Sequence, residues 1–178
     1  ITPGTKFVSV GGAIASDVHG KNHHIHGCFS ECLDSIELLL GDGRLLSCSR
    51  NEHPELFHAT CGGMGLTGII CSAALRLLPI ESAYIEQTTY KAANLEAAFR
   101  LFEQHGNSTY SVAWIDCRAS GKALGRSLLM IGEHARDGRL ELPETKTLSV
   151  PVDMPPALLN RFSIQAFNTL YYQRMLRQ

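Results

Sequence analysis

Clustered glycine constrains the fold of this chain more than any other feature of its sequence. Its sixteen glycines gather mainly at residues 11–12, 41–43 and 62–68. Glycine lacks a Cβ, so such clusters mark tight turns or places where a ligand can approach the main chain. The densest cluster contains Gly63-x-Gly65-x-x-Gly68, which formally matches the dinucleotide-binding fingerprint.

The order of elements around this cluster excludes a Rossmann site. Such a site needs a strand before the glycines and a helix after them, so that the helix N-terminus faces a pyrophosphate. Pro54 and the acid behind it predict a short helix over residues 54–60, and the apolar run 69–78 predicts a strand. The helix therefore comes first and the strand second. A plain tight turn stays open, as does a loop that presses its amides onto another flat or phosphorylated ligand.

Composition and charge exclude two classes of protein. The 178 residues are 44% hydrophobic and 19% charged, which indicates a globular chain. The formal net charge of −1 leaves no positive excess for binding nucleic acid through its phosphates. No apolar run approaches the roughly 18 residues of a membrane span. The start at Ile1, without an initiator Met or a signal-like segment, predicts that the sequence is a fragment.

The six cysteines are too few for a disulfide scaffold. Four of them, among them Cys48 and Cys71, lie in apolar surroundings, which predicts buried free thiols. Free thiols favour a reducing compartment, so we expect a cytoplasmic protein.

Periodicity and turn residues predict mixed elements in the first half of the chain. We expect a strand over 6–10 that Gly11 and Gly12 end, one helical turn over 13–17, and a histidine-rich loop over 19–27. The segments 35–40 and 44–48 flank Gly41-Asp42-Gly43, which predicts a β-hairpin. The strand over 69–78 is expected to be mostly buried.

Composition changes after Pro79, where a second α+β region is expected. Alternation predicts strands over 84–90, 110–116 and 127–131. Asn94 can cap a helix over 95–105, which Gly106 ends. From Leu142 onward four prolines interrupt the chain, so we expect a mobile linker leading into a truncated element over 156–178.

A run of metal-ligand residue types follows the predicted helical turn. Four histidines and two thiols fall within fourteen residues: His19, His23, His24, His26, Cys28 and Cys32. Zinc binds imidazole and thiolate, but structural zinc sites usually draw on two separated pairs, and this run has no distant pair. Three interpretations stay open: a zinc-stabilised binding module, a polar loop that contacts a substrate or cofactor, and surface histidines without a ligand. We assign no residue as a metal ligand.

The segment Ser9-Val10-Gly11-Gly12 is the third candidate site. A strand that runs into two glycines before a helical turn leaves backbone amides unobstructed. Such amides can bind the anionic or carbonyl edge of a ligand, although turn geometry alone is the alternative. The histidine run follows closely, so both segments are expected to line one pocket.

Taken together, these motifs resemble the PCMH-type FAD-binding domain of the vanillyl-alcohol oxidase superfamily. The similarity is densest in Pro3-Gly4-Thr5-x-x-Val8-x-Val10-Gly11-Gly12-Ala13-Ile14-x-x-Asp17-x-His19-Gly20-Lys21-Asn22-His23-His24. It continues through residues 55–70 and is weaker at 113–116, at 124–126 and near Tyr171. Within the superfamily the chain looks most like the polyprenylphosphoryl-ribose 2′-oxidases, which are flavoprotein subunits of an epimerase.

The resemblance implies an α+β fold in two parts. Residues 1–80 would form part of the FAD-binding domain, with its upstream pyrophosphate loop absent. Residues 81–178 would form the truncated start of an α+β substrate-binding domain. The implied cofactor is FAD, bound largely through the main chain by Gly4, Ser9, Val10, Gly11, Gly12, Ser16, Asp17, Val18, His19 and Ile70.

The implied reaction oxidises a sugar hydroxyl to a ketone by hydride transfer to flavin N5, at C2′ of a polyprenylphosphoryl ribose. The implied catalytic residues are Lys21, which would hold the substrate phosphate, and His19, which would orient the hydroxyl. The implied partners are a phosphorylated sugar-lipid and a short-chain dehydrogenase/reductase subunit. The resemblance also implies membrane association through the lipid-linked substrate and a role in cell-wall biosynthesis. An aldonolactone or alditol oxidase of the same superfamily is the alternative enzyme, and the fragment alone is expected to be inactive.

Overall fold

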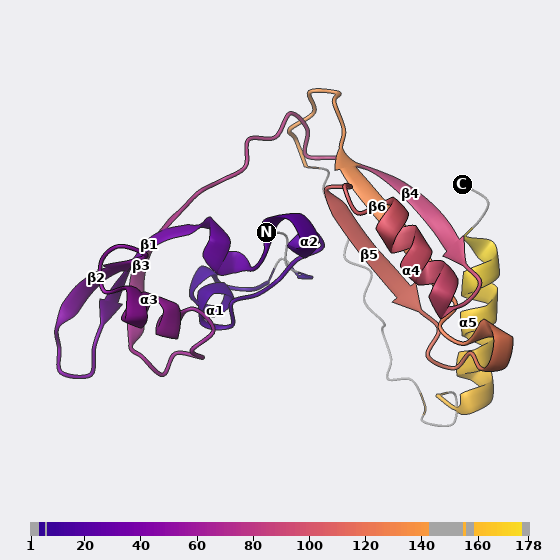
Figure 1. The fold of residues 1–178 in the computed structure, drawn as a ribbon, viewed down its shortest axis with the longest axis horizontal. Helices are drawn as coiled ribbons and strands as arrows, with labels where there is room; N and C mark the ends of the chain where they lie inside the picture. The colour runs from indigo at the N-terminus through magenta and orange to yellow at the C-terminus, as the bar shows by residue number, and fades with distance from the viewer. Residues whose placement is uncertain (1–3, 6, 143–154, 156–158, 176–178) are drawn as a thin grey trace. The chain divides into compact units, whose positions relative to one another are not determined.

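A computed structural model describes residues 4–5, 7–142, 155 and 159–175 of the chain. The chain divides into two compact units, Ile1–Pro79 and Ile80–Gln178, called unit 1 and unit 2 below (Figure 1). Both combine helices with antiparallel sheet, so the α+β class is confirmed. That unit 1 has the PCMH-type arrangement stays a prediction. Within the described ranges, no helix is both long enough and apolar enough to span a bilayer.

Unit 1 is built on a three-stranded antiparallel sheet with the order β2-β1-β3. β1 (Leu33–Leu39) and β2 (Leu45–Ser49) form the predicted hairpin, and Gly43 supplies the positive φ of 85° in its turn. β3 (Ile69–Leu75) pairs with the other side of β1. Most β3 side chains are exposed, so the prediction of a mostly buried strand is wrong. The reason is its place at the sheet edge, where only some of its side chains reach the core.

Short helices complete unit 1: α1 (Val10–Ala15), α2 (His23–His26), the 3-10 turn η1 (Phe29–Cys32) and α3 (Pro54–Thr60). α3 confirms the helix predicted there, with Pro54 in its first turn. Ile14 of α1 and Phe57 of α3 are buried together with the inner side chains of β1 and Cys48 of β2. This core holds α1 against the sheet.

The strand predicted over 6–10 is wrong for the described part of that range. Residues 7–9 form no strand, and α1 begins at Val10. The physical reason is a helix cap, because the Gly12 amide donates to Ser9 Oγ at 3.1 Å and Ala13 N donates to Ser9 O at 2.9 Å. Both glycines therefore lie inside a helix instead of ending a strand. The loop expected over 19–27 likewise contains a helical turn, α2.

Unit 2 contains a second three-stranded antiparallel sheet, with the order β4-β6-β5. Its strands are β4 (Ile85–Ala92), β5 (Tyr110–Ile115) and the central, mostly buried β6 (Ser127–His134). α4 (Leu95–Gln104) packs on this sheet, and Asn94 Oδ1 caps it by accepting from Ala97 N at 2.9 Å (Figure 1). The predicted strand–helix–strand order is confirmed. The 3-10 turn η2 (Gly121–Ala123) lies between β5 and β6.

α5 (Arg161–Arg174) lies within residues 156–178, where an element was expected to follow the linker. Asn160 and Ser163 form a capping box at its start. Asn168 donates to Asp116 at 2.7 Å, and Tyr172 donates to the Ala92 carbonyl at 3.1 Å. These polar contacts attach α5 to the ends of β4 and β5. The rest of the expected linker, 143–154 and 156–158, lies outside the described residues.

Candidate functional site

The main chain is open near the start of α1. A Cβ added at Gly11 would meet no heavy atom within 4 Å. Gly12 differs, because a Cβ there would lie 3.1 Å from Ser9 Oγ, the atom that caps the helix. Gly11 therefore offers bare backbone to an approaching group, whereas Gly12 is needed by the cap itself.

The glycine-rich segment 61–68 packs against the other end of α1. Gly62 N donates to Ile14 O at 3.0 Å, and Met64 N donates to Ala15 O at 2.8 Å. Ser16, which follows α1, directs its hydroxyl toward Met64 Sδ at 3.7 Å. The structure thus brings the predicted residue Ser16 and the glycine cluster together.

Steric demands within the protein explain two of these glycines. A Cβ at Gly63 would lie 2.1 Å from Ala59 O, and a Cβ at Gly68 would lie 2.5 Å from Leu39 O. Gly65 is different, since its φ is 79° and a Cβ there would meet nothing within 4 Å. The tight-turn interpretation accounts for Gly63 and Gly68, and contact with a ligand stays a prediction for the open edge at Gly65.

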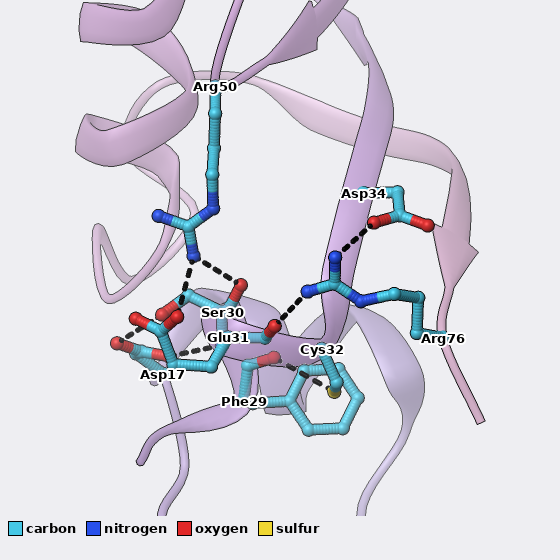
Figure 2. A network of polar contacts seen from close by, with 8 residues as sticks. All are labelled: Asp17, Phe29, Ser30, Glu31, Cys32, Asp34, Arg50 and Arg76. Carbon is cyan, nitrogen blue, oxygen red and sulfur yellow. Dashed lines mark hydrogen bonds and ion pairs between the residues drawn. The ribbon is translucent and has the colours of Figure 1, made fainter. Parts of the chain in front are cut away.

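Asp17 holds the chain in an unusual conformation directly after α1. Its φ of 41° is in the left-handed region, which non-glycine residues rarely adopt. Its carboxylate accepts hydrogen bonds from Ser30 N at 2.8 Å and from Ser30 Oγ at 3.1 Å (Figure 2). The Asp17 side chain is thus committed to η1, and a contact between Asp17 and a cofactor would have to use the main chain.

Two arginines that the sequence analysis did not single out hold η1 as well (Figure 2). Arg50 Nη2 donates to Ser30 O at 3.0 Å and to Glu31 Oε2 at 3.2 Å. Arg76 donates to Glu31 O and pairs with Asp34 at 3.1 Å. Exposed ion pairs contribute little one by one, so what matters is the combined attachment of the η1 main chain. No motif in the sequence marks these arginines, because their partners lie 19 to 45 residues away.

The histidine-rich segment between Val18 and Phe29 is a closed loop. His19 and Cys28 form an isolated antiparallel bridge, and Phe29 N donates to Val18 O at 2.9 Å. His19 and Lys21 are both exposed on this loop. The bridge brings the two ends of the loop, His19 and Cys28, together. Asp17 lies two residues before the first end, and η1 directly follows the second.

The loop brings two residues of the zinc hypothesis into contact. Cys28 Sγ lies 3.8 Å from His23 Nδ1. The His23 and His19 rings meet edge-on, with 5.7 Å between their ring centroids. Across the residues that the structure describes, no group of three or more His, Cys, Asp or Glu side chains is placed to hold a metal ion. The geometry therefore gives the zinc module no support beyond this pair.

The remaining predicted cofactor residues fall into two groups. Val10 is the first residue of α1 and Val18 follows Asp17, on the same continuous stretch as Ser9 and His19. Gly4 and Ile70 come from other parts of unit 1. Gly4 is exposed, and a Cβ there would meet nothing within 4 Å, whereas Ile70 pairs with Leu38 and packs on the core. A contact between Ile70 and a cofactor would therefore use the Ile70 main chain.

The thiols of unit 1 differ in their surroundings. Burial, and after it the negative charge of Asp17, raises the pKa of Cys61 to about 11. Burial also raises the pKa of Cys48, which lies in the core. Cys71 is exposed, so the prediction of a buried thiol is wrong there, and Cys117 in unit 2 is exposed as well. For Cys71 the cause is again the edge position of β3.

Comparison with known proteins places this geometry in context. No protein-family model matches the sequence. The chain is 34% identical over 186 residues to decaprenylphosphoryl-β-D-ribose oxidase of Mycolicibacterium smegmatis, covering 98% of this chain and 40% of that protein. The chain is a relative of this oxidase. The relationship confirms the predicted resemblance to sugar oxidases and is consistent with an oxidoreductase.

Further relatives show how far this similarity to the oxidase extends. A Streptomyces coelicolor protein named "Uncharacterized protein in mprA 5′region" is 35% identical over 89% of this chain and 45% of its own length. D-arabinono-1,4-lactone oxidase of Yarrowia lipolytica is 36% identical over 52% of this chain and 17% of its own length. The chain thus spans less than half the length of these oxidase relatives.

Proposed function

We propose that this chain is part of an FAD-dependent oxidoreductase that oxidises a sugar hydroxyl. In this proposal unit 1 carries part of the flavin site, and unit 2 begins the substrate-binding part. The observation that carries the proposal is the 34% identity to a ribose oxidase over 98% of the chain. A match of that extent covers both units, so it does not depend on the glycine motifs alone.

The residues of unit 1 fit a flavin. Gly11 presents main chain with open space where a side chain would be, and Gly65 does the same at the edge of the glycine cluster. Flat rings and phosphates need such close approach to backbone amides. The stretch Ser9–Gly12 and Ser16–His19 would provide these contacts, with Gly4 and Ile70 adding to them. When bound, the flavin supplies the hydride acceptor, while the protein binds and orients the substrate.

His19 and Lys21 are the proposed catalytic residues. Both are exposed on the loop that the His19–Cys28 bridge closes, and the Asp17–Ser30 contact fixes the start of that loop. A lysine ammonium suits a phosphate as a point charge, and a neutral imidazole can accept a hydrogen bond from a hydroxyl. We propose that Lys21 binds the substrate phosphate and that His19 orients the hydroxyl that loses its proton.

The finer proposal is oxidation at C2′ of a polyprenylphosphoryl ribose. The relative named for a phosphorylated ribose matches nearly the whole chain, whereas the lactone oxidase matches about half of it. This difference favours the lipid-linked sugar over an aldonolactone, which is the second candidate. A short-chain dehydrogenase/reductase partner, a cytoplasmic location and attachment to the membrane through the substrate belong to the same proposal.

Flavin reduction tests the proposal and separates the two substrates. The full-length protein that contains this chain is purified and its flavin absorbance is recorded, and a polyprenylphosphoryl ribose or D-arabinono-1,4-lactone is then added without oxygen. We expect bound FAD that the phosphorylated ribose bleaches and the lactone does not. Bleaching by the lactone alone would favour the second candidate. A protein that holds no flavin at all would contradict the oxidoreductase proposal.

A further inference from the structure

We infer that Cys28 is a reactive thiol, with His23 as the base that takes its proton, and that soft electrophiles modify unit 1 at this position. Neither the relatives' names nor the proposed flavin chemistry requires such a site. The inference rests on the partner of this sulfur and on how firmly both residues are held.

The geometry lets His23 accept a hydrogen bond from the Cys28 thiol. Cys28 Sγ and His23 Nδ1 lie 3.8 Å apart, a contact length possible for a sulfur donor. When the ring carries its proton on Nε2, Nδ1 has the free lone pair that a thiol proton needs. The edge-on contact with the His19 ring, at 5.7 Å, restricts rotation of the His23 ring.

The main chain around Cys28 is fixed from both sides. The bridge to His19 holds Cys28, and Phe29 N donates to Val18 O. Asp17 and Arg50 then hold Ser30, two residues further on (Figure 2). The thiol therefore keeps its place beside His23, while its partial exposure leaves it reachable by a small molecule.

The other five thiols have different surroundings. Four of them donate to main-chain carbonyls: Cys32 to Phe29 O, Cys48 to Leu46 O, Cys71 to Ile69 O and Cys117 to Ile115 O. For Cys61, burial raises the pKa to about 11, which keeps that thiol protonated. Among the described residues, Cys28 is the one thiol that contacts a side-chain nitrogen base, His23.

Alkylation by iodoacetamide, a haloacetamide, illustrates the reaction expected at Cys28. The Cys28 proton moves to His23 Nδ1, and the thiolate attacks the methylene carbon of iodoacetamide. An S–C bond forms, the C–I bond breaks, and iodide leaves with the electron pair. If the proposed function holds, the adduct would lie across the bridge from His19 and would obstruct the loop that faces the substrate.

Competitive alkylation within one molecule tests the inference. The protein is treated briefly with a limiting amount of iodoacetamide at neutral pH, quenched, and digested, and the labelling rate of each cysteine is measured by mass spectrometry. We expect Cys28 to react about tenfold faster than the more exposed Cys71 and Cys117, because a base beside the Cys28 thiol can take its proton as the sulfur attacks. Equal or slower labelling of Cys28 would overturn the inference.

Two variants identify the base. His23→Gln is expected to lower the Cys28 rate to about that of Cys71, while His26→Gln, on the same helical turn, is expected to leave it unchanged. Labelling of the buried Cys48 reports on unfolding in the same sample, so a misfolded variant is recognised. A Cys28 rate that His23→Gln does not change would overturn the role of His23. The measurement needs neither flavin nor turnover, so its failure would leave the proposed function untouched.

Discussion

Neighbouring glycines near the start of α1 have different roles at the scale of single residues. Gly12 lies where a Cβ would press on the capping hydroxyl of Ser9, and Gly11 lies where a Cβ would meet nothing. A substitution at Gly11 therefore tests ligand approach, whereas one at Gly12 would mix that test with damage to the helix cap.

In the full-length protein, Gly11→Val is expected to weaken flavin binding without unfolding unit 1. Its side chain would fill the open space against which a flavin is proposed to lie, and we expect at least a tenfold loss of affinity, about 1.4 kcal/mol. Flavin retained after gel filtration measures this. Gly41→Val is the matched control, since a Cβ at Gly41 also meets nothing within 4 Å but lies in the hairpin turn. Equal flavin content in the two variants would remove Gly11 from the site.

In the full-length enzyme, Lys21→Ala and His19→Ala are expected to separate substrate binding from turnover. Loss of the ammonium should raise KM for a phosphorylated substrate and spare flavin content. Loss of the imidazole should lower kcat by roughly 10²-fold if His19 assists proton transfer. Steady-state kinetics and flavin absorbance on the same samples give both readouts. If flavin content falls together with activity in both variants, the loop packs on the flavin and the substrate-side assignment is wrong.

At the scale of elements, α5 is attached to the sheet through the buried Asp116, which also forms an ion pair with Arg126. Arg126 Nη2 lies 2.6 Å from Asp116 Oδ2, and Asp116 also accepts from Asn168 of α5. The Trp114 ring meets Tyr171 of α5 edge-on at 5.0 Å. Since Trp114 is the chain's single tryptophan, its fluorescence reports on the attachment of α5.

Acid is expected to release α5. Burial alone would raise the pKa of Asp116, but hydrogen bonds from the Arg118 amide, Asn168 and Arg126 outweigh burial and hold it below 3.8. A carboxyl whose pKa is lowered by folding stabilises the fold above its unfolded pKa, and that stabilisation is lost as pH falls through the folded value. Trp114 emission should therefore change only in strongly acidic solution. A transition near neutral pH would show that another group controls the attachment.

Asp116→Ala is expected to destabilise unit 2 by about 3 kcal/mol, because it leaves Arg126 as an unpaired charge that is largely buried. Urea unfolding followed by Trp114 fluorescence measures this change. Glu96→Ala removes the exposed partner of Arg100 and is expected to change stability by less than about 0.5 kcal/mol. Similar values for the two variants would contradict the role given to the Asp116 pair.

At the scale of the whole molecule, the chain carries almost no net charge and many exposed apolar side chains. Its formal net charge is −1 and its isoelectric point is about 6.8. Phe7, Leu66 and Leu77 are each more than 80% exposed. Charge repulsion is then too weak near neutral pH to keep such surfaces apart.

Self-association is expected to be strongest near the isoelectric point and to fall as the pH is raised. Static light scattering across the neutral and mildly alkaline range measures it. Leu66→Glu adds a charge at a fully solvated position of the glycine segment and should reduce scattering near neutral pH. Scattering that is independent of pH and of this substitution would show that net charge does not control the association.

Local patterns in the sequence were sufficient for much of the fold. The turn at residues 41–43 predicts the β1–β2 hairpin, Pro54 predicts the start of α3, and Asn94 predicts the start of α4. Each signal acts within a few residues, through a fixed φ or a capping hydrogen bond, so neighbouring residues decide the outcome. The resemblance to sugar oxidases also rests on local strings and is confirmed by the relatives.

Contacts between distant residues decided the rest. Whether Ser9 ends a strand or caps a helix depends on Ile14 reaching the core, and the exposure of Cys71 depends on β3 lying at a sheet edge. Arg50 and Arg76 bind η1 from positions far along the chain, and Asp116 attaches α5 across 52 residues. Such pairings follow from how elements pack in space, which a short window of sequence does not encode. The sequence by itself therefore determined the local elements and the family resemblance, and the tertiary structure decided which side chains hold them in place.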